Sequence, residues 1–172
     1  MGGTVSSCIS AIIIIVITHT TGTYDAGIFS LGYANAMLFT NIGTLDTRSH
    51  QCANINEKFS FSDYFTFRMV TGFFMLVFSV IFVLAFHYSF DKMVVTLLMC
   101  FFCAIINVSD IFQGNAQIRG RLDLGGQSLA IRSMINLVVF SSVYLYSENL
   151  KLALVLMIIS ALIWLITYDR KK

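Results

Sequence analysis

Long apolar runs alternate with short polar segments along the whole chain. Six of these runs have the length of helices that cross a membrane, for which about 20 residues are needed. The pattern predicts spans at residues 3–20, 27–45, 64–86, 93–114, 126–146 and 150–168. We therefore expect an all-α integral membrane protein built as a single six-helix bundle.

The composition agrees with this pattern. Of the 172 residues, 57% are hydrophobic and only 12% are charged, whereas soluble domains carry about 25% charged residues. No soluble domain of useful size is expected. The predicted span 27–45 is rich in small residues, which let helix backbones approach closely. This pattern fits a place inside the bundle and ordinary membrane-helix composition equally well. These residues are Gly27, Ser30, Gly32, Ala34, Ala36 and Gly43.

The basic residues divide unevenly between the two sides that six spans would define. With the C-terminus inside, the outer side carries only Lys92 and Lys151. The inner loops and helix ends carry the other nine, which are Arg48, Lys58, Arg68, Arg119, Arg121, Arg132, Arg170, Lys171 and Lys172. Because short loops rich in Lys and Arg stay in the cytoplasm, we expect both termini to be cytoplasmic.

Three ionisable residues lie within the predicted spans rather than between them. Arg68, Asp110 and Arg132 each fall about four to seven residues from the inner end of a span, which is roughly 6–10 Å at the rise of an α-helix. One interpretation is a cytoplasm-facing cavity whose spare positive charge receives an anionic headgroup, phosphate above all. The alternative is a structural Arg–Asp pair with one snorkelling arginine. Nearby, Asp46 and Arg48 are read as helix-capping residues in preference to ligand contacts.

Other chemistry finds little support in the residues. Cys100 and Cys103 match C-x-x-C, but they have no second ligand pair and lie in an apolar run, so we interpret them as helix packing. The three histidines have no metal-ligand spacing. We find no nucleophile–base pair and no phosphate-cradling glycine loop, and the basic residues are too dispersed for nucleic acid. We expect no enzyme activity, metal or cofactor.

Three stretches of the chain together resemble a known protein family. One is the start of the second span, residues 25–34, and another combines residues 48–51 with 59–68. A third is the turn between the fourth and fifth spans, where the resemblance rests on Asp110, Gly114, Gln117, Arg121, Asp123, Ser128 and Arg132. In these stretches the chain resembles bacterial polysaccharide flippases of the multidrug/oligosaccharidyl-lipid/polysaccharide exporter superfamily. The resemblance covers nearly the whole chain, and its motifs are those of membrane helix ends.

The resemblance implies transport of an isoprenoid-pyrophosphate-linked oligosaccharide across the bacterial cytoplasmic membrane for surface polysaccharide. Such flippases resemble two six-helix lobes around a central cavity, so this chain would be the N-terminal lobe. We expect a second transporter half or a homodimer as its partner. The candidate headgroup residues are Arg68, Asp110, Arg132, Arg48 and Arg121.

Two other classes of protein remain as alternatives. The first is a truncated, non-transporting membrane scaffold or interaction protein. The second is a membrane enzyme acting on lipid phosphate, which would need a catalytic dyad that the sequence does not offer.

The uneven placement of the basic residues gives a test of topology. A reporter fused after Lys172 should be active only in the format that requires a cytoplasmic location, because nine basic residues against two hold that side inside. A reporter that is active only when exported would reject this orientation.

Overall fold

A computed structural model describes residues 2–45, 47–53, 60–118 and 122–168. This part of the chain is helical and has no strand, which confirms the expected all-α class. In chain order the helices are α1 (Gly2–Thr20), α2 (Thr23–Thr44), α3 (Thr47–Ala53), α4 (Phe61–Ala85), α5 (Phe90–Ile118), α6 (Leu122–Ser147) and α7 (Leu150–Thr167).

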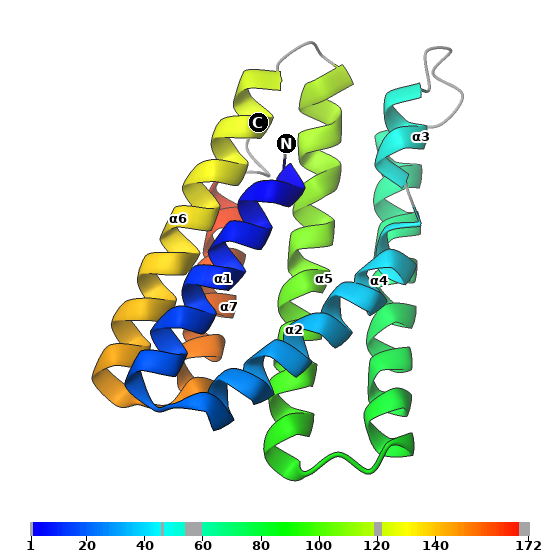
Figure 1. The fold of residues 1–172 in the computed structure, drawn as a ribbon. Helices are drawn as coiled ribbons and strands as arrows, with labels where there is room; N and C mark the ends of the chain where they lie inside the picture. Colours follow the sequence, from blue (N-terminus) through cyan, green and yellow to red (C-terminus); the bar gives the residue numbers. More distant parts are fainter. Residues whose placement is uncertain (1, 46, 54–59, 119–121, 169–172) are drawn as a thin grey trace.

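The long helices run up and down, except that α2 crosses the bundle obliquely, and each reverses the direction of the one before it (Figure 1). The α1–α2, α4–α5 and α6–α7 connections all lie at one end of the bundle. The first turn of α1 and the last turn of α7 both lie toward the other end, which we call the terminal end. The start of α1 and the end of α7 therefore share one side of the bundle, as an even number of spans requires.

Within the described residues, four helices are long and apolar enough to cross a membrane. They are α4, α7, most of α5 (Phe90–Asn115) and most of α6 (Gly125–Ser147). The chain is accordingly a multi-pass membrane protein. In α1 the apolar segment Ile9–Thr20 is too short to count among these four, and α2 is not among them either. The first two of the six predicted spans therefore remain a prediction, although both segments are helical.

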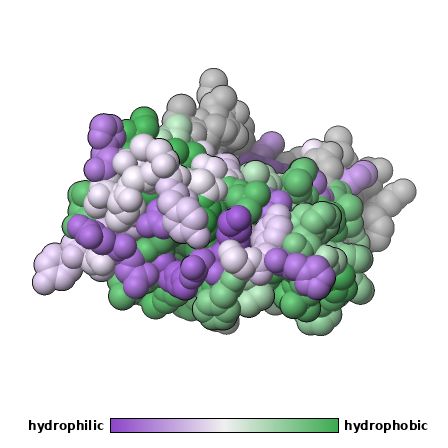
Figure 2. Space-filling view, turned by 60° about the horizontal axis from the view of Figure 1, so that its bottom comes forward, coloured by the Kyte–Doolittle hydropathy of each residue, from purple (hydrophilic) through white to green (hydrophobic). Residues whose placement is uncertain are grey.

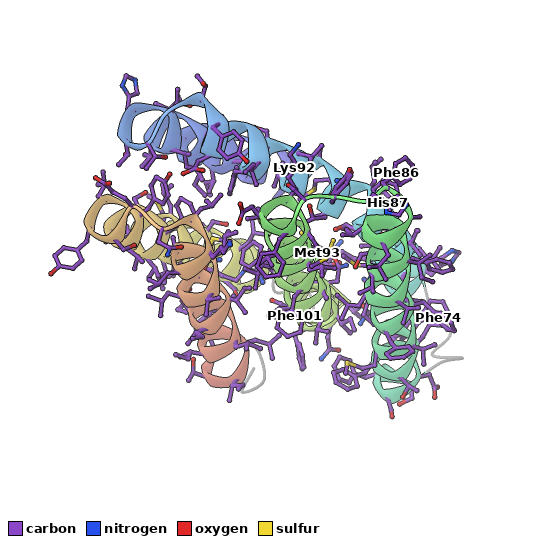
Figure 3. The ribbon with its side chains drawn as sticks, turned by 90° about the horizontal axis from the view of Figure 1, so that it is seen from below. Phe74, Phe86, His87, Lys92, Met93 and Phe101 are labelled. Atoms are coloured by element: carbon purple, nitrogen blue, oxygen red, sulfur yellow. The ribbon has the colours of Figure 1, made fainter. Side chains whose placement is uncertain are left out.

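The surface of the bundle suits a lipid environment. On α4 the side chains of Phe67, Val70, Phe74, Phe78 and Ile81 are exposed and follow one another at spacings of three and four residues, so they form a single apolar stripe. Phe74 projects outward from the bundle (Figure 3). Polar side chains gather at the end opposite the termini, and apolar surface flanks them (Figure 2).

Helix α5 is the centre of the bundle, because it contacts α2, α3, α4, α6 and α7. Seen from below, it lies between α4 on one side and the α6–α7 pair on the other, with α2 across it (Figure 3). Cys100 and Cys103 of α5 are free and buried in the main apolar core, as their position in an apolar run predicts. Phe29 of α2 packs on Phe140 of α6 in the same core, with ring centroids 5.8 Å apart.

Small residues bring α2 close to its neighbours. A β-carbon at Gly32 would lie 3.1 Å from a side-chain carbon of Val95 and 3.5 Å from the backbone of Thr96, both on α5. A β-carbon at Gly43 would lie 2.8 Å from both Asn107 Nδ2 and Met75 Sδ. Of the two interpretations of these small residues, close helix packing therefore holds at Gly32 and Gly43, and Ala36 on the same helix is fully buried. Gly27 and Ala34 are exposed and do not contribute to it.

The contact at Gly43 gives a test of this packing. Gly43→Leu should destabilise the protein by about 1–3 kcal/mol, because the added side chain displaces Asn107 and Met75 from a filled site. The measurement is the melting temperature in detergent. Gly72→Leu is the matched control, since a β-carbon there has no neighbour within 4 Å. Equal melting temperatures for the two variants would contradict the packing.

Candidate functional site

The carboxylate of Asp110 on α5 joins two arginines from other helices. Arg48 of α3 donates from Nη1 to Oδ1 at 2.7 Å, and Arg68 of α4 donates from Nη2 to Oδ2 at 3.4 Å. Each oxygen therefore accepts from a different guanidinium. Helices α3, α4 and α5 are held together through one acidic side chain near the terminal end of the bundle.

Arg68 is enclosed by protein, with only 1% of its side chain exposed. Besides Asp110, its Nη1 donates to the carbonyl oxygens of Gly43 at 3.2 Å and Thr44 at 3.0 Å. These carbonyls lie in the last turn of α2, where no further helical N–H follows to bond them and where a cation is favoured by the helix dipole. Thr71 adds a bond from Oγ1 to Gly43 O at 2.9 Å. Arg68 thus ties α2 to α4 and α5.

Helix α3 carries Arg48 into the site. The predicted spans leave residues 46–63 as a loop on the inner side, and the structure shows that part of this loop is the short helix α3. Gln51, one turn after Arg48, is 2% exposed and donates from Nε2 to Ile111 O at 3.4 Å. Its amide lies against Gly114, where a β-carbon would be 2.5 Å from Oε1. Polar side chains rather than an apolar face dock α3 on α5, so hydropathy alone could not find it.

The expected capping role of Arg48 is wrong. Its side chain leaves α3 and pairs with Asp110, and Nη2 also donates to Gln117 Oε1 at 3.2 Å. The side chain remains 38% exposed. Asp46, its expected capping companion, lies outside the described residues. Arg48 and Gln51 share one face of α3 at a spacing of three residues, which is the signal that could have paired them once the segment was known to be helical.

An open hollow lies over this network. Its volume is about 600 Å³. Two arginines and one aspartate give it a formal charge of +1, and hydroxyl and amide groups provide further polar atoms. The lining residues are Asn41, Thr44, Leu45, Thr47, Arg48, Ser49, Arg68 and Asp110. We call this hollow the arginine hollow.

Arg132 of α6 lies at the same level but on a different side of α5. It is 5% exposed and donates from Nη1 to Ser109 Oγ. Ser109 and Asp110 are consecutive, so their side chains point about 100° apart around the helix. The predicted common level of Arg68, Asp110 and Arg132 therefore agrees with the structure, but Asp110 holds Arg48 together with Arg68, where only one arginine was expected.

Arg121 lies outside the described residues, so its expected place in the headgroup site stays a prediction. Within the described residues no three His, Cys, Asp or Glu side chains are grouped so that they could hold a metal ion.

Comparison with known proteins gives no relative from which a function could be carried over. No family model, curated protein or solved structure matches the chain. The site must therefore be interpreted from its own geometry.

We expect the loss of the shared Asp110 carboxylate to cost more stability than the loss of an exposed ion pair. Asp110→Asn should destabilise the protein by about 3 kcal/mol, because it leaves the enclosed charge of Arg68 without its counter-ion. Adding Arg68→Gln to that variant should restore part of the loss. Melting temperature in detergent is the measurement.

The matched control is Lys151→Gln at the other end of the bundle. It breaks the Lys151–Asp91 pair, which has a length of 2.6 Å and side chains 39% and 55% exposed. Exposed pairs contribute little to stability, so this variant should melt within a few degrees of the parent protein. A loss equal to that of Asp110→Asn would contradict the role given to Arg68.

Proposed function

We propose that this chain is one lobe of a bacterial flippase for isoprenoid-pyrophosphate-linked oligosaccharides, and that the arginine hollow receives the pyrophosphate. The observation that carries the proposal is the partly exposed side chain of Arg48 at an open hollow of formal charge +1. The resemblance of the chain's helix ends to those of polysaccharide flippases supports the same reading.

The chemistry of the hollow suits phosphate. A guanidinium presents parallel N–H donors in a plane, which match two phosphate oxygens, and charge-assisted bonds of this kind are short and strong. The hydroxyls of Ser49 and Thr44 line the same hollow. These hydroxyls can form hydrogen bonds with the uncharged oxygens of a sugar phosphate. A cation alone would not select for those oxygens.

The two arginines have different roles in this proposal. Arg68 is enclosed and bonded to α2 and Asp110, so it sets the position of the carboxylate and contributes its charge to the hollow. Arg48 is more exposed, and it can exchange one bond to Asp110 for a bond to the ligand while the carboxylate keeps Arg68. Arg48 is thus the ligand contact, and Arg68 and Asp110 are positioning residues.

The hollow lies at the terminal end of the bundle, which the basic residues assign to the cytoplasm. A lipid-linked sugar that is assembled on the inner leaflet would therefore meet the hollow before transport. The second lobe would be supplied by another chain or by a second copy of this one, because the central cavity of such a transporter lies between two lobes.

A membrane scaffold without transport is the second candidate function. The contacts of Arg68 favour it, since they join α2, α4 and α5 and explain the network by stability alone. In that case Arg48 contacts no ligand, and replacing it should leave the affinity for a pyrophosphate ligand unchanged.

Binding of farnesyl pyrophosphate to the full chain in nanodiscs tests the proposal. Arg48→Gln keeps a donor but removes the charge, and one lost charge-assisted bond of roughly 1.5–3 kcal/mol corresponds to a tenfold or greater loss of affinity. Farnesol, which lacks the pyrophosphate, should bind at least tenfold more weakly than farnesyl pyrophosphate.

Lys92→Gln is the control, because Lys92 lies at the opposite end of the bundle (Figure 3). It should leave the affinity unchanged. Equal affinity of the parent protein and Arg48→Gln would reject the headgroup site and favour the scaffold. Complementation of a flippase-deficient strain by the chain with its second half, lost on Arg48→Gln at equal protein level, would establish transport.

A further inference from the structure

A second cavity lies on another side of α5 from the arginine hollow. Its wall is formed by α1, α2, α5 and α6, with one residue of α7, and its volume is about 140 Å³. Arg132 is the one charged side chain among its described lining residues. We call it the Arg132 cavity. None of the residues that line it lines the arginine hollow.

The polar residues of the Arg132 cavity are gathered toward its terminal end. Asn107 of α5, Thr40 of α2 and Ser133 of α6 line the cavity together with Arg132. Asn136 lies about 6 Å further along α6, and its Oδ1 accepts a bond from Ser160 Oγ at 2.8 Å. The amide N–H group of Asn136 is therefore the part that can donate to a ligand.

The opposite end of the cavity is apolar. Met99 lies eight residues before Asn107 on α5, which is about 12 Å deeper along the helix. Phe29 of α2 and Met157 of α7 line this deeper part together with Met99. Phe29, Met99 and Met157 are all buried in the main core. The cavity therefore has a cationic end at the level of the inner face and an apolar end toward the middle of the bundle.

The size of the cavity limits what it can hold. A cavity of about 150 Å³ is filled by one molecule of benzene, so the Arg132 cavity takes about five to six carbon atoms. The polar and apolar ends are about 12 Å apart, so the space is long and narrow. One unbranched or lightly branched chain fits this shape, whereas two chains or a sugar do not.

We propose that the Arg132 cavity binds an anionic amphiphile, with a carboxylate or phosphate at Arg132 and a single short apolar chain, or the first segment of a longer one, toward Met99. A guanidinium donates charge-assisted hydrogen bonds to a carboxylate or phosphate, and the apolar wall gains from covering a chain. The chain lies along the helices, which is the orientation of an amphiphile in the inner leaflet. The site does not depend on the headgroup site at Arg48.

Binding of hexanoate and hexyl phosphate to the purified chain in nanodiscs tests this inference. Both anions should bind, and hexanol and inorganic phosphate should each bind at least tenfold more weakly, because each lacks one of the two halves that the cavity recognises. Tighter binding of hexanoate would indicate a fatty-acid source of the natural ligand, and tighter binding of hexyl phosphate an alkyl phosphate source. Hexanol binding as tightly as both anions would overturn the proposal.

Two substitutions test the charge and the volume of the Arg132 cavity separately. Arg132→Gln removes the charge and should weaken binding of both anions at least tenfold. Ser133→Phe places a ring in the cavity and should abolish binding, while Ser142→Phe is the matched control, because Ser142 is an exposed residue of the same helix. Unchanged affinity in Ser133→Phe would show that the ligand lies elsewhere.

A second measurement covers the case in which Arg132→Gln does not fold. Cys103 lines the cavity, so hexyl phosphate should slow its alkylation in the parent protein and have no such effect in Ser133→Phe; equal alkylation with and without ligand in the parent would overturn the proposal. Protection of Cys103 reports on the Arg132 cavity alone, because Cys103 does not line the arginine hollow. Failure at the Arg132 cavity is thereby distinguished from failure of the headgroup site.

Discussion

The carboxylate of Asp110 is the interaction on which the terminal end of the bundle depends. A guanidinium as enclosed as that of Arg68 is costly unless a counter-ion and hydrogen-bond acceptors surround it. Asp110 provides the charge, and the last carbonyls of α2 provide the acceptors. The same carboxylate also accepts from Arg48 and so holds α3 in place. Four helices thus meet around one acidic residue that lies within a helix of the bundle.

This arrangement is possible only because α2 lies very close to α4 and α5. Gly43 leaves room for Asn107 and Met75 beside the helix axis, and its own carbonyl then comes within reach of Arg68 and Thr71. A side chain at position 43 would hold α2 away and lengthen those bonds. Where apolar transfer adds little to helix association in lipid, such close packing and interhelical hydrogen bonds carry much of the stability.

Helix α5 separates two polar regions with different properties. On one side the arginine hollow is open and its lining is largely polar, which suits a ligand that enters from water or from the headgroup layer. On another side the Arg132 cavity is narrow and mostly apolar, which suits a chain. The consecutive residues Ser109 and Asp110 serve the two regions because their side chains leave α5 in different directions. The level of a charged residue in a membrane helix therefore does not by itself say which site it belongs to.

The sequence by itself determined the long helices, their approximate ends and the level of the charged residues. Long apolar runs have few alternatives in a membrane, where backbone groups must be bonded within the helix, and the constant rise of a helix converts residue counts into depth. The pairing of the charges was decided only by the tertiary structure. Arg132 meets one particular side of α5, and that side depends on how the helices are rotated about their axes. Packing between side chains that are distant in the sequence sets this rotation. The docking of α3, which lacks an apolar signature and rests on Gln51 and Gly114 from segments about sixty residues apart, was likewise decided by tertiary contacts alone.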